Sequence, residues 1–162
     1  MTPNDVLAAG YRMSHGLVHR MVDDLTPEEW NRQPVPGANS AAWVLGHLTL
    51  TLRNGLRRLG ASDVPDFPAD LEEKFKTTRQ PASDQSDYGD AKAMLAVFDV
   101  CLERFMTMVR SLPADVLAGE PDFKHPFMTN KAESILFGSL HIAMHTGQLS
   151  TIRRSLGKPP VV

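Results

Sequence analysis

The fold is decided most clearly by residues 88–112, YGDAKAMLAVFDVCLERFMTMVRSL. Apolar residues recur at intervals of three and four along this segment: Ala91, Met94, Leu95, Phe98, Cys101, Leu102, Phe105 and Met108. This spacing places them on one face of an α-helix, which has about 3.6 residues per turn. Pro113 follows and is expected to end the helix, because proline cannot continue it. The segment therefore predicts a long amphipathic helix that buries one face.

Three further segments have the helical period, and no segment alternates as a β-strand would. They are predicted over residues 4–24, 40–59 and 129–156. Thr2 is the expected N-cap of the first, and Gly157 is expected to end the last. The apolar line expected for the first segment consists of Met13, Leu17, Met21 and Leu25.

The connections between these helices differ in length. Thr26 and Glu29 have capping-box spacing, which predicts a short helical turn after the first long helix. Residues 61–87, a stretch that includes Pro81, are long for a loop in a bundle. We expect them to form a crossover with a short helix near residues 69–76. Four helices of similar length with one long connection predict an all-α four-helix bundle, running up and down with a long crossover between the second and third helices.

Composition excludes several classes of protein. The 17 Lys and Arg are outnumbered by 19 Asp and Glu, so no basic excess exists to hold a nucleic acid. No apolar run approaches the ~18 residues that cross a bilayer, which excludes a membrane protein. A lone Cys101 and an N-terminus without basic or apolar signal regions favour the cytoplasm. At 162 residues, the whole range 1–162 is expected to be one domain.

Three histidines, His47, His141 and His145, are the candidate functional residues. Each lies where the apolar face of a predicted helix would carry a leucine. Residues four apart lie about 40° apart around a helix and roughly 6 Å along it, so His141 and His145 can point at the same volume. A third imidazole from a facing helix completes a site for a divalent metal ion with open positions. Gln148 is a candidate partner for the outer nitrogen of His145.

Spacing alone does not establish a ligand pair. For each histidine taken singly, a core histidine with satisfied partners is the alternative. A second pair with the same spacing, His15 and His19, lies about 200° around its helix from the expected apolar line. This pair is predicted to face solvent, a partner chain or the edge of the bundle, and not to bind metal. His125, beside Pro126, is predicted to be a loop residue at the surface, with a lid over the pocket as the alternative.

The segments around the three histidines resemble the DinB-like superfamily, also called the DinB/YfiT-like metalloenzymes. The resemblance is carried by PVPGANS at 34–40, WVLGHL at 43–48, HIAMHTGQL at 141–149 and RRSLG at 153–157, and it extends over nearly the whole chain. It implies an up-down four-helix bundle with a long crossover. It also implies a divalent metal ion bound by His47, His141 and His145. Thr146 stands where many relatives have an arginine.

The resemblance also implies a chemistry. Characterised relatives use the metal to activate a low-molecular-weight thiol, such as bacillithiol or mycothiol, for transfer or isomerisation. A divalent ion stabilises a thiolate relative to its thiol, which makes the nucleophile available at neutral pH. We therefore expect a metal-dependent thiol S-transferase or thiol-dependent isomerase that acts on small electrophiles, with Zn or Ni as the metal. A homodimer is the family expectation for the assembly.

Two other functions are compatible with the sequence. A metal ion held by three imidazoles lowers the pKa of bound water toward ~7, so a hydrolase is the first alternative. A hydrolase requires a general base, but Glu133 is about 80° around the helix from His141, and no other carboxylate stands out. The second alternative is a non-enzymatic metal-binding or stress-response protein whose bundle mainly dimerises.

Four other residues are predicted to be structural. Cys101 falls on an apolar stripe and is expected to be a small buried hydrophobe, not a nucleophile. Arg153 and Arg154 complement the dipole at the end of the last helix, with binding of a substrate carboxylate as the alternative. Trp43, one turn before His47, is expected to pack in the core.

Overall fold

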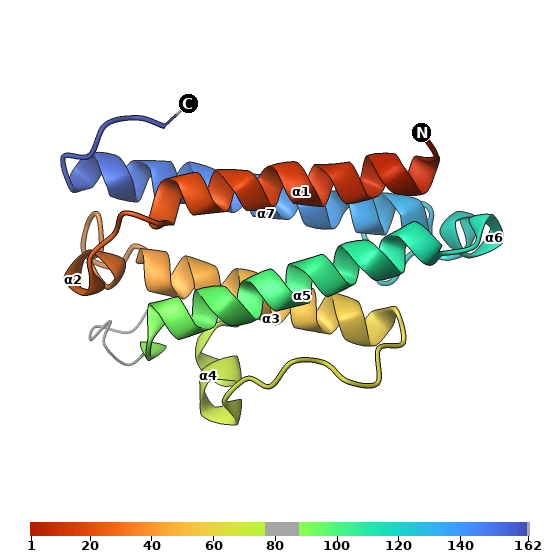
Figure 1. Cartoon of the computed structure of the whole chain (residues 1–162), viewed down its shortest axis with the longest axis horizontal. Coiled ribbons are helices and arrows are strands. Elements are labelled where there is room, and N and C mark those ends of the chain that lie inside the picture. The colour runs from red at the N-terminus through yellow and green to blue at the C-terminus, as the bar shows by residue number, and fades with distance from the viewer. Residues whose placement is uncertain (77–87, 162) are drawn as a thin grey trace.

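The computed structural model describes residues 1–76 and 88–161 and is helical, with no β-strand in those ranges (Figure 1). Its four long helices are α1 (Pro3–Val22), α3 (Ala41–Arg58), α5 (Ala91–Ser111) and α7 (Lys131–Ser155). They confirm the predicted all-α bundle and its long second connection. The part of that connection that contains Pro81 lies outside the described residues. No helix within the described ranges has both the length and the apolar character needed to cross a bilayer.

The long crossover sets the directions of the helices. α1 packs against α7 and α5, and α3 packs against the same two helices, so α1 and α3 occupy opposite corners of the bundle. In Figure 1, α1 and α7 run in one direction while α3 and α5 run in the other. The chain returns along the length of α3 before α5 begins. The order of directions is therefore up, down, down, up.

Each long helix begins where the sequence supplies an N-cap. The caps are Thr2, Ser40, Asp90 and Asn130. Each side chain accepts a hydrogen bond from a backbone N–H two or three residues further on, which satisfies a donor that the helix leaves unpaired. α5 begins at Ala91, later than predicted, because Asp90 caps it. The predicted capping box of Thr26 and Glu29 is confirmed at the start of the short helix α2 (Pro27–Trp30).

The crossover covers the outer side of α3. It carries the predicted short helix, α4 (Ala69–Lys74), whereas α6 (Ala114–Ala118) after α5 was not predicted. Buried Arg53 holds the crossover to α3, since its Nε donates to the carbonyl of Pro65 at 2.9 Å and its guanidinium pairs with Glu72. As a result, every residue over 41–50 is buried.

The buried face of α1 differs from the predicted one. Met13 is 65% exposed, and the buried residues are Leu7, Ala8, Tyr11, Ser14, Val18, Met21 and Val22. Tyr11 reaches α7 because Gly138 leaves room for it: a Cβ there would lie 2.0 Å from the phenol oxygen. The buried face is therefore centred closer to His15 and His19 than the predicted line. These two histidines lie half-buried at the edge of the bundle.

Candidate metal centre

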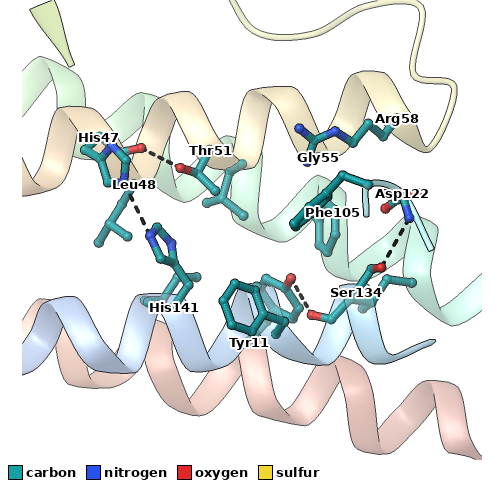
Figure 2. Close-up of a pocket in the computed structure, with 16 residues that line it drawn as sticks. Tyr11, His47, Leu48, Thr51, Gly55, Arg58, Phe105, Asp122, Ser134 and His141 are labelled. Atoms are coloured by element: carbon teal, nitrogen blue, oxygen red, sulfur yellow. Dashed lines mark hydrogen bonds between the residues drawn. The ribbon is translucent and has the colours of Figure 1, made fainter. Parts of the chain in front are cut away.

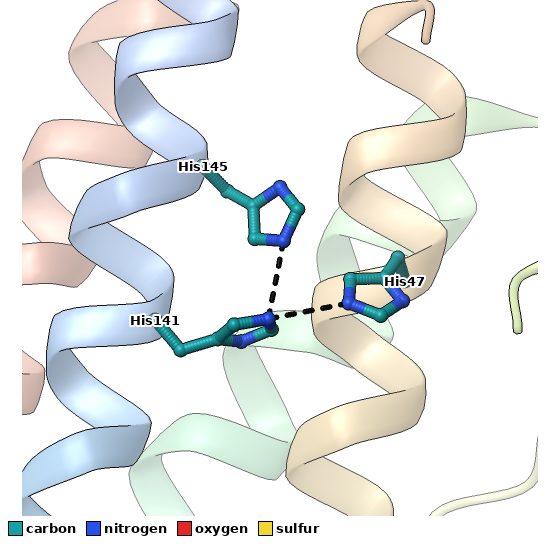
Figure 3. A group of neighbouring side chains, drawn as sticks. All are labelled: His47, His141 and His145. Carbon is teal, nitrogen blue, oxygen red and sulfur yellow. Dashed lines mark hydrogen bonds between the residues drawn. The ribbon is translucent and has the colours of Figure 1, made fainter. Parts of the chain in front are cut away.

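The structure brings the three candidate histidines together between α3 and α7 (Figure 3). Nε2 of His141 lies 3.3 Å from Nε2 of His47 and 3.2 Å from Nε2 of His145. One ring nitrogen from each histidine lies within 4.8 Å of the other two. Two nitrogens bound to a tetrahedral zinc ion at about 2.0 Å would be about 3.3 Å apart. The three rings therefore form a group that can hold one metal ion.

In His47 and His145, the hydrogen bond made by Nδ1, the outer nitrogen, determines the protonation of Nε2, the inner nitrogen. Nδ1–H of His47 donates to the carbonyl of Phe75 at 2.9 Å. Nδ1–H of His145 donates to the amide oxygen of Gln148 at 3.1 Å, so the predicted contact with Gln148 is confirmed. Both rings then present an Nε2 lone pair to His141. An N–H of His141 can satisfy only one of them well, whereas a cation accepts all three lone pairs, so the donor set fits a metal.

His141 lacks an outer partner of this kind. Its Nδ1 is buried and has no hydrogen-bond partner in the described part of the chain. The ring is instead oriented by packing, because it meets both His47 and His145 edge to face with centroids 5.2 and 4.6 Å apart. His141 is therefore the ligand candidate whose position depends most on the other two.

Burial keeps the three rings neutral. It lowers the pKa of His141 to about 4, with a further contribution from the neighbouring rings of His145 and His47. Burial and the nearby His47 likewise lower the pKa of His145 to about 4, against the opposing hydrogen bond to Gln148. Burial also lowers the pKa of His47, although the Phe75 carbonyl acts in the other direction. Neutral imidazole is the form that binds metal ions, so no ring has to lose a proton at neutral pH.

A glycine next to His47 fixes the position of its outer partner. A Cβ at Gly46 would lie 2.3 Å from the ring of Phe75. Only glycine therefore lets this fully buried ring pack directly on α3, where the Phe75 carbonyl reaches His47. Trp43 stacks on the His47 ring at 5.0 Å and within 6° of parallel, so its predicted packing role is confirmed.

A cavity of about 270 Å³ opens beside His47 and His141 (Figure 2). Much of its wall is apolar and comes from Leu48, Leu52, Phe105, Phe137 and Ile142. Arg58, Asp122 and Ser134 lie at the end away from the histidines. The cavity thus joins a group of nitrogen donors to a polar opposite end through apolar walls.

The charged residues of the cavity were not identified from the sequence. In the sequence, Arg58 is a basic residue in the last turn of a predicted helix. Only the packing of the helices shows that it borders a cavity. Its guanidinium lies over the ring of Phe123 at 5.0 Å, and no carboxylate in the described ranges pairs with it. Asp122, by contrast, pairs with Lys131 at 2.6 Å. Among the described residues, Arg58 is therefore a cation at the cavity for which no ion pair is found.

The two arginines at the end of α7 lie elsewhere. Arg153 is buried, donates to the carbonyl of Met21 at 3.0 Å and pairs with Asp24. It therefore fastens the end of α7 to the end of α1. Neither Arg153 nor Arg154 lines the cavity.

The remaining predicted residues lie outside the three-histidine group. Cys101 is fully buried, and burial raises the pKa of its thiol to about 11, so it stays protonated at neutral pH. Glu133 accepts hydrogen bonds at the start of α7 from Thr129. His125 lies in the loop before α7, where its ring contacts the cavity-lining Phe137 at 5.0 Å.

Comparison with known proteins agrees with this arrangement. A family model described as the DinB superfamily matches residues 11–149, a range that includes all three histidines. No curated protein matches the chain significantly.

Gly46→Ala is expected to destabilise the protein by about 1–3 kcal/mol, because the new Cβ would overlap the ring of Phe75. The same displacement is expected to break the hydrogen bond from His47 to the Phe75 carbonyl. Denaturant unfolding measures the first effect, and ¹⁵N NMR of the His47 ring, which distinguishes its tautomers, measures the second.

Gly147→Ala is the matched control for this substitution. Gly147 is exposed within α7, and a Cβ there would meet nothing within 4 Å. The control should stabilise the protein by about 0.5–1 kcal/mol, because alanine favours the helix. If Gly46→Ala behaved in the same way and kept the His47 tautomer, the proposed role of the glycine would be wrong.

The metal-free protein is expected to lose stability as the pH falls from 6.5 to about 4. The pKa values of His141 and His145 are about 4 in the folded protein, against 6.5 for an ordinary histidine. Between these values the unfolded chain binds more protons, so stability rises with pH and is lost on acidification. Urea unfolding across this range measures the slope. His145→Gln should flatten it, and an unchanged slope would show that these rings titrate normally.

Proposed function

The chain belongs to the DinB superfamily, and we propose that it is a metal-dependent enzyme that acts on small electrophiles with a low-molecular-weight thiol. The thiol would either be transferred to the electrophile or assist its isomerisation. One observation carries the proposal: three neutral imidazoles converge beside a cavity of about 270 Å³. Imidazoles that converge without a carboxylate among them suit a divalent ion with positions open to a ligand.

His47, His141 and His145 would hold this ion, and Zn and Ni are the first candidates because both accept imidazole. When bound, the metal supplies a positive charge that stabilises a thiolate at neutral pH. The nucleophile would come from a bound thiol such as bacillithiol or mycothiol, since Cys101 is buried and protonated. Such thiols belong to a reducing cytoplasm, the compartment that a lone cysteine also favours.

The cavity supports a ligand that is apolar in its middle and anionic at one end. Leu48, Phe137 and Ile142 give the cavity an apolar wall between its two ends. Arg58, which forms no ion pair with the described residues, would receive a carboxylate or a similar group of the ligand. His47 and Arg58 are eleven residues apart on one helix, which corresponds to about 16 Å. A ligand that spans both ends is therefore elongated.

The geometry supports thiol activation over hydrolysis. A hydrolase requires a general base close to the water that it activates. Among the described residues that line the cavity, Asp122 is the one with a carboxylate. It pairs with Lys131 and lies at the end of the cavity away from the histidines. A bound thiol requires no such base once its proton is lost to solvent.

His141→Ala is expected to bind one divalent ion per chain fewer than the wild type and to lose thiol-dependent turnover. Elemental analysis of untagged protein after dialysis against Zn or Ni measures the ion. A panel of electrophiles with bacillithiol, mycothiol or cysteine measures turnover.

His125→Ala is the control for the metal measurement, because His125 lies outside the three-histidine group and the variant should keep the ion. Equal metal content in His141→Ala and the wild type would contradict the metal site. If the variant lost the ion but the wild type showed no turnover with any thiol, the proposed enzymatic activity would be contradicted. That result would favour a role in metal binding alone.

Arg58→Gln is expected to raise the KM for an anionic thiol about tenfold and to leave kcat nearly unchanged, because a charge-assisted contact to the ligand is lost. A neutral thiol such as 2-mercaptoethanol should show no such difference. Arg57→Gln is the matched control, since Arg57 pairs with Glu72 and does not line the cavity. Equal KM values for Arg58→Gln and the wild type would show that the anion does not bind there.

A further inference from the structure

We propose a second metal site, formed by His15 and His19 of α1 and Asp99 of α5. The proposal does not depend on the function proposed above. α1 packs against α5 on one side of the bundle, and the three-histidine group lies between α3 and α7 on the opposite side. The two sites therefore share no residue and no wall.

The three donor atoms already lie close together, because both imidazoles contact the same oxygen of Asp99. Nε2 of His15 lies 2.8 Å from Oδ1 of Asp99, and Nε2 of His19 lies 2.9 Å from the same oxygen. All three donor atoms lie within 4.8 Å of one another. Ligand atoms at right angles around an ion, each at about 2.1 Å, are about 3.0 Å apart. Small shifts of three side chains would therefore admit one ion.

The surroundings of His19 are those of a metal ligand. Its outer nitrogen, Nδ1, lies 2.8 Å from Oδ1 of Asp23, one turn further along α1. A carboxylate on the outer nitrogen fixes the ring and increases its basicity, which is the usual arrangement behind a metal-bound histidine. His15 is fixed differently: its ring stacks on the fully buried Phe98 at 5.9 Å and meets His19 edge to face at 4.5 Å.

Accessibility and charge indicate the class of ion. The side chains of His15, His19 and Asp99 are 31%, 26% and 37% exposed, so an ion can enter from solvent and keep water on its remaining positions. Two imidazoles and one carboxylate suit zinc and neighbouring divalent transition ions, whereas magnesium and calcium prefer oxygen ligands. Asp23 and Asp99 together supply two negative charges against the charge of the ion.

The position of the site suggests what the ion would do. α1 supplies two ligands and α5 supplies the third, so the ion would cross-link the second half of α1 to the first half of α5. An ion that binds only the folded chain stabilises it by mass action. This second site is therefore expected to be structural and to raise the melting temperature.

The test uses His141→Ala, in which the three-histidine group is disrupted. Titration of this variant with Zn²⁺ or Co²⁺, followed by calorimetry and by Co²⁺ absorption, is expected to show one ion per chain with micromolar affinity and a raised melting temperature. His141→Ala combined with His15→Gln should lose this ion. His141→Ala combined with Asp23→Asn should bind it roughly 10–100-fold more weakly, because the outer partner of His19 is lost.

His141→Ala combined with His125→Ala is the matched control and should keep the ion, since His125 is also half-buried but belongs to neither group of metal-ligating side chains. NMR of the histidine side chains in His141→Ala alone provides a readout that requires no further variant: Zn²⁺ should shift the ring signals of His15 and His19 together. Ring signals that stay unchanged at saturating Zn²⁺, or an ion that persists in His141→Ala/His15→Gln, would overturn the proposal.

Discussion

A buried imidazole requires a partner for each of its two nitrogens, and this requirement organises the centre of the bundle. The outer nitrogen of His47 donates to the carbonyl of Phe75, a residue of the crossover. This contact requires the crossover to pack against α3, and the close approach of Phe75 requires glycine at position 46. His145 meets the same requirement through Gln148 on its own helix. The inner nitrogens of both rings are then left facing His141, and a cation is the partner that would satisfy all three.

The same crossover determines what surrounds the site. Because it turns the second and third long helices parallel, α3 lies between α5 and α7 and is covered on its outer side by the connection itself. The histidines are thereby desolvated and kept neutral, and the space between α3 and α7 becomes a cavity with Arg58 at its far end. The long connection thus supplies the outer partner of His47 and part of the burial that lowers the pKa of this ring.

The two pairs of histidines spaced four apart show how the environment decides their chemistry. On α7 the pair faces a third imidazole in a buried position, with low pKa values and no carboxylate within the group. On α1 the pair contacts Asp99 in a partly exposed position, and the carboxylate of Asp23 contacts the outer nitrogen of His19. Both groups can hold a metal ion, but the first leaves it beside a cavity and the second leaves it between helices.

Local patterns in the sequence determined the four long helices, the N-cap Thr2 and the three histidines of the candidate site, because helical period, capping and i, i+4 spacing depend on neighbours along the chain. The sequence also predicted Gln148, which lies within one turn of His145. It did not predict the exposure of Met13, the role of Arg58 or the meeting of Asp99 with His15 and His19. Those depend on which helices become neighbours and how they are rotated, and packing across the bundle decides both.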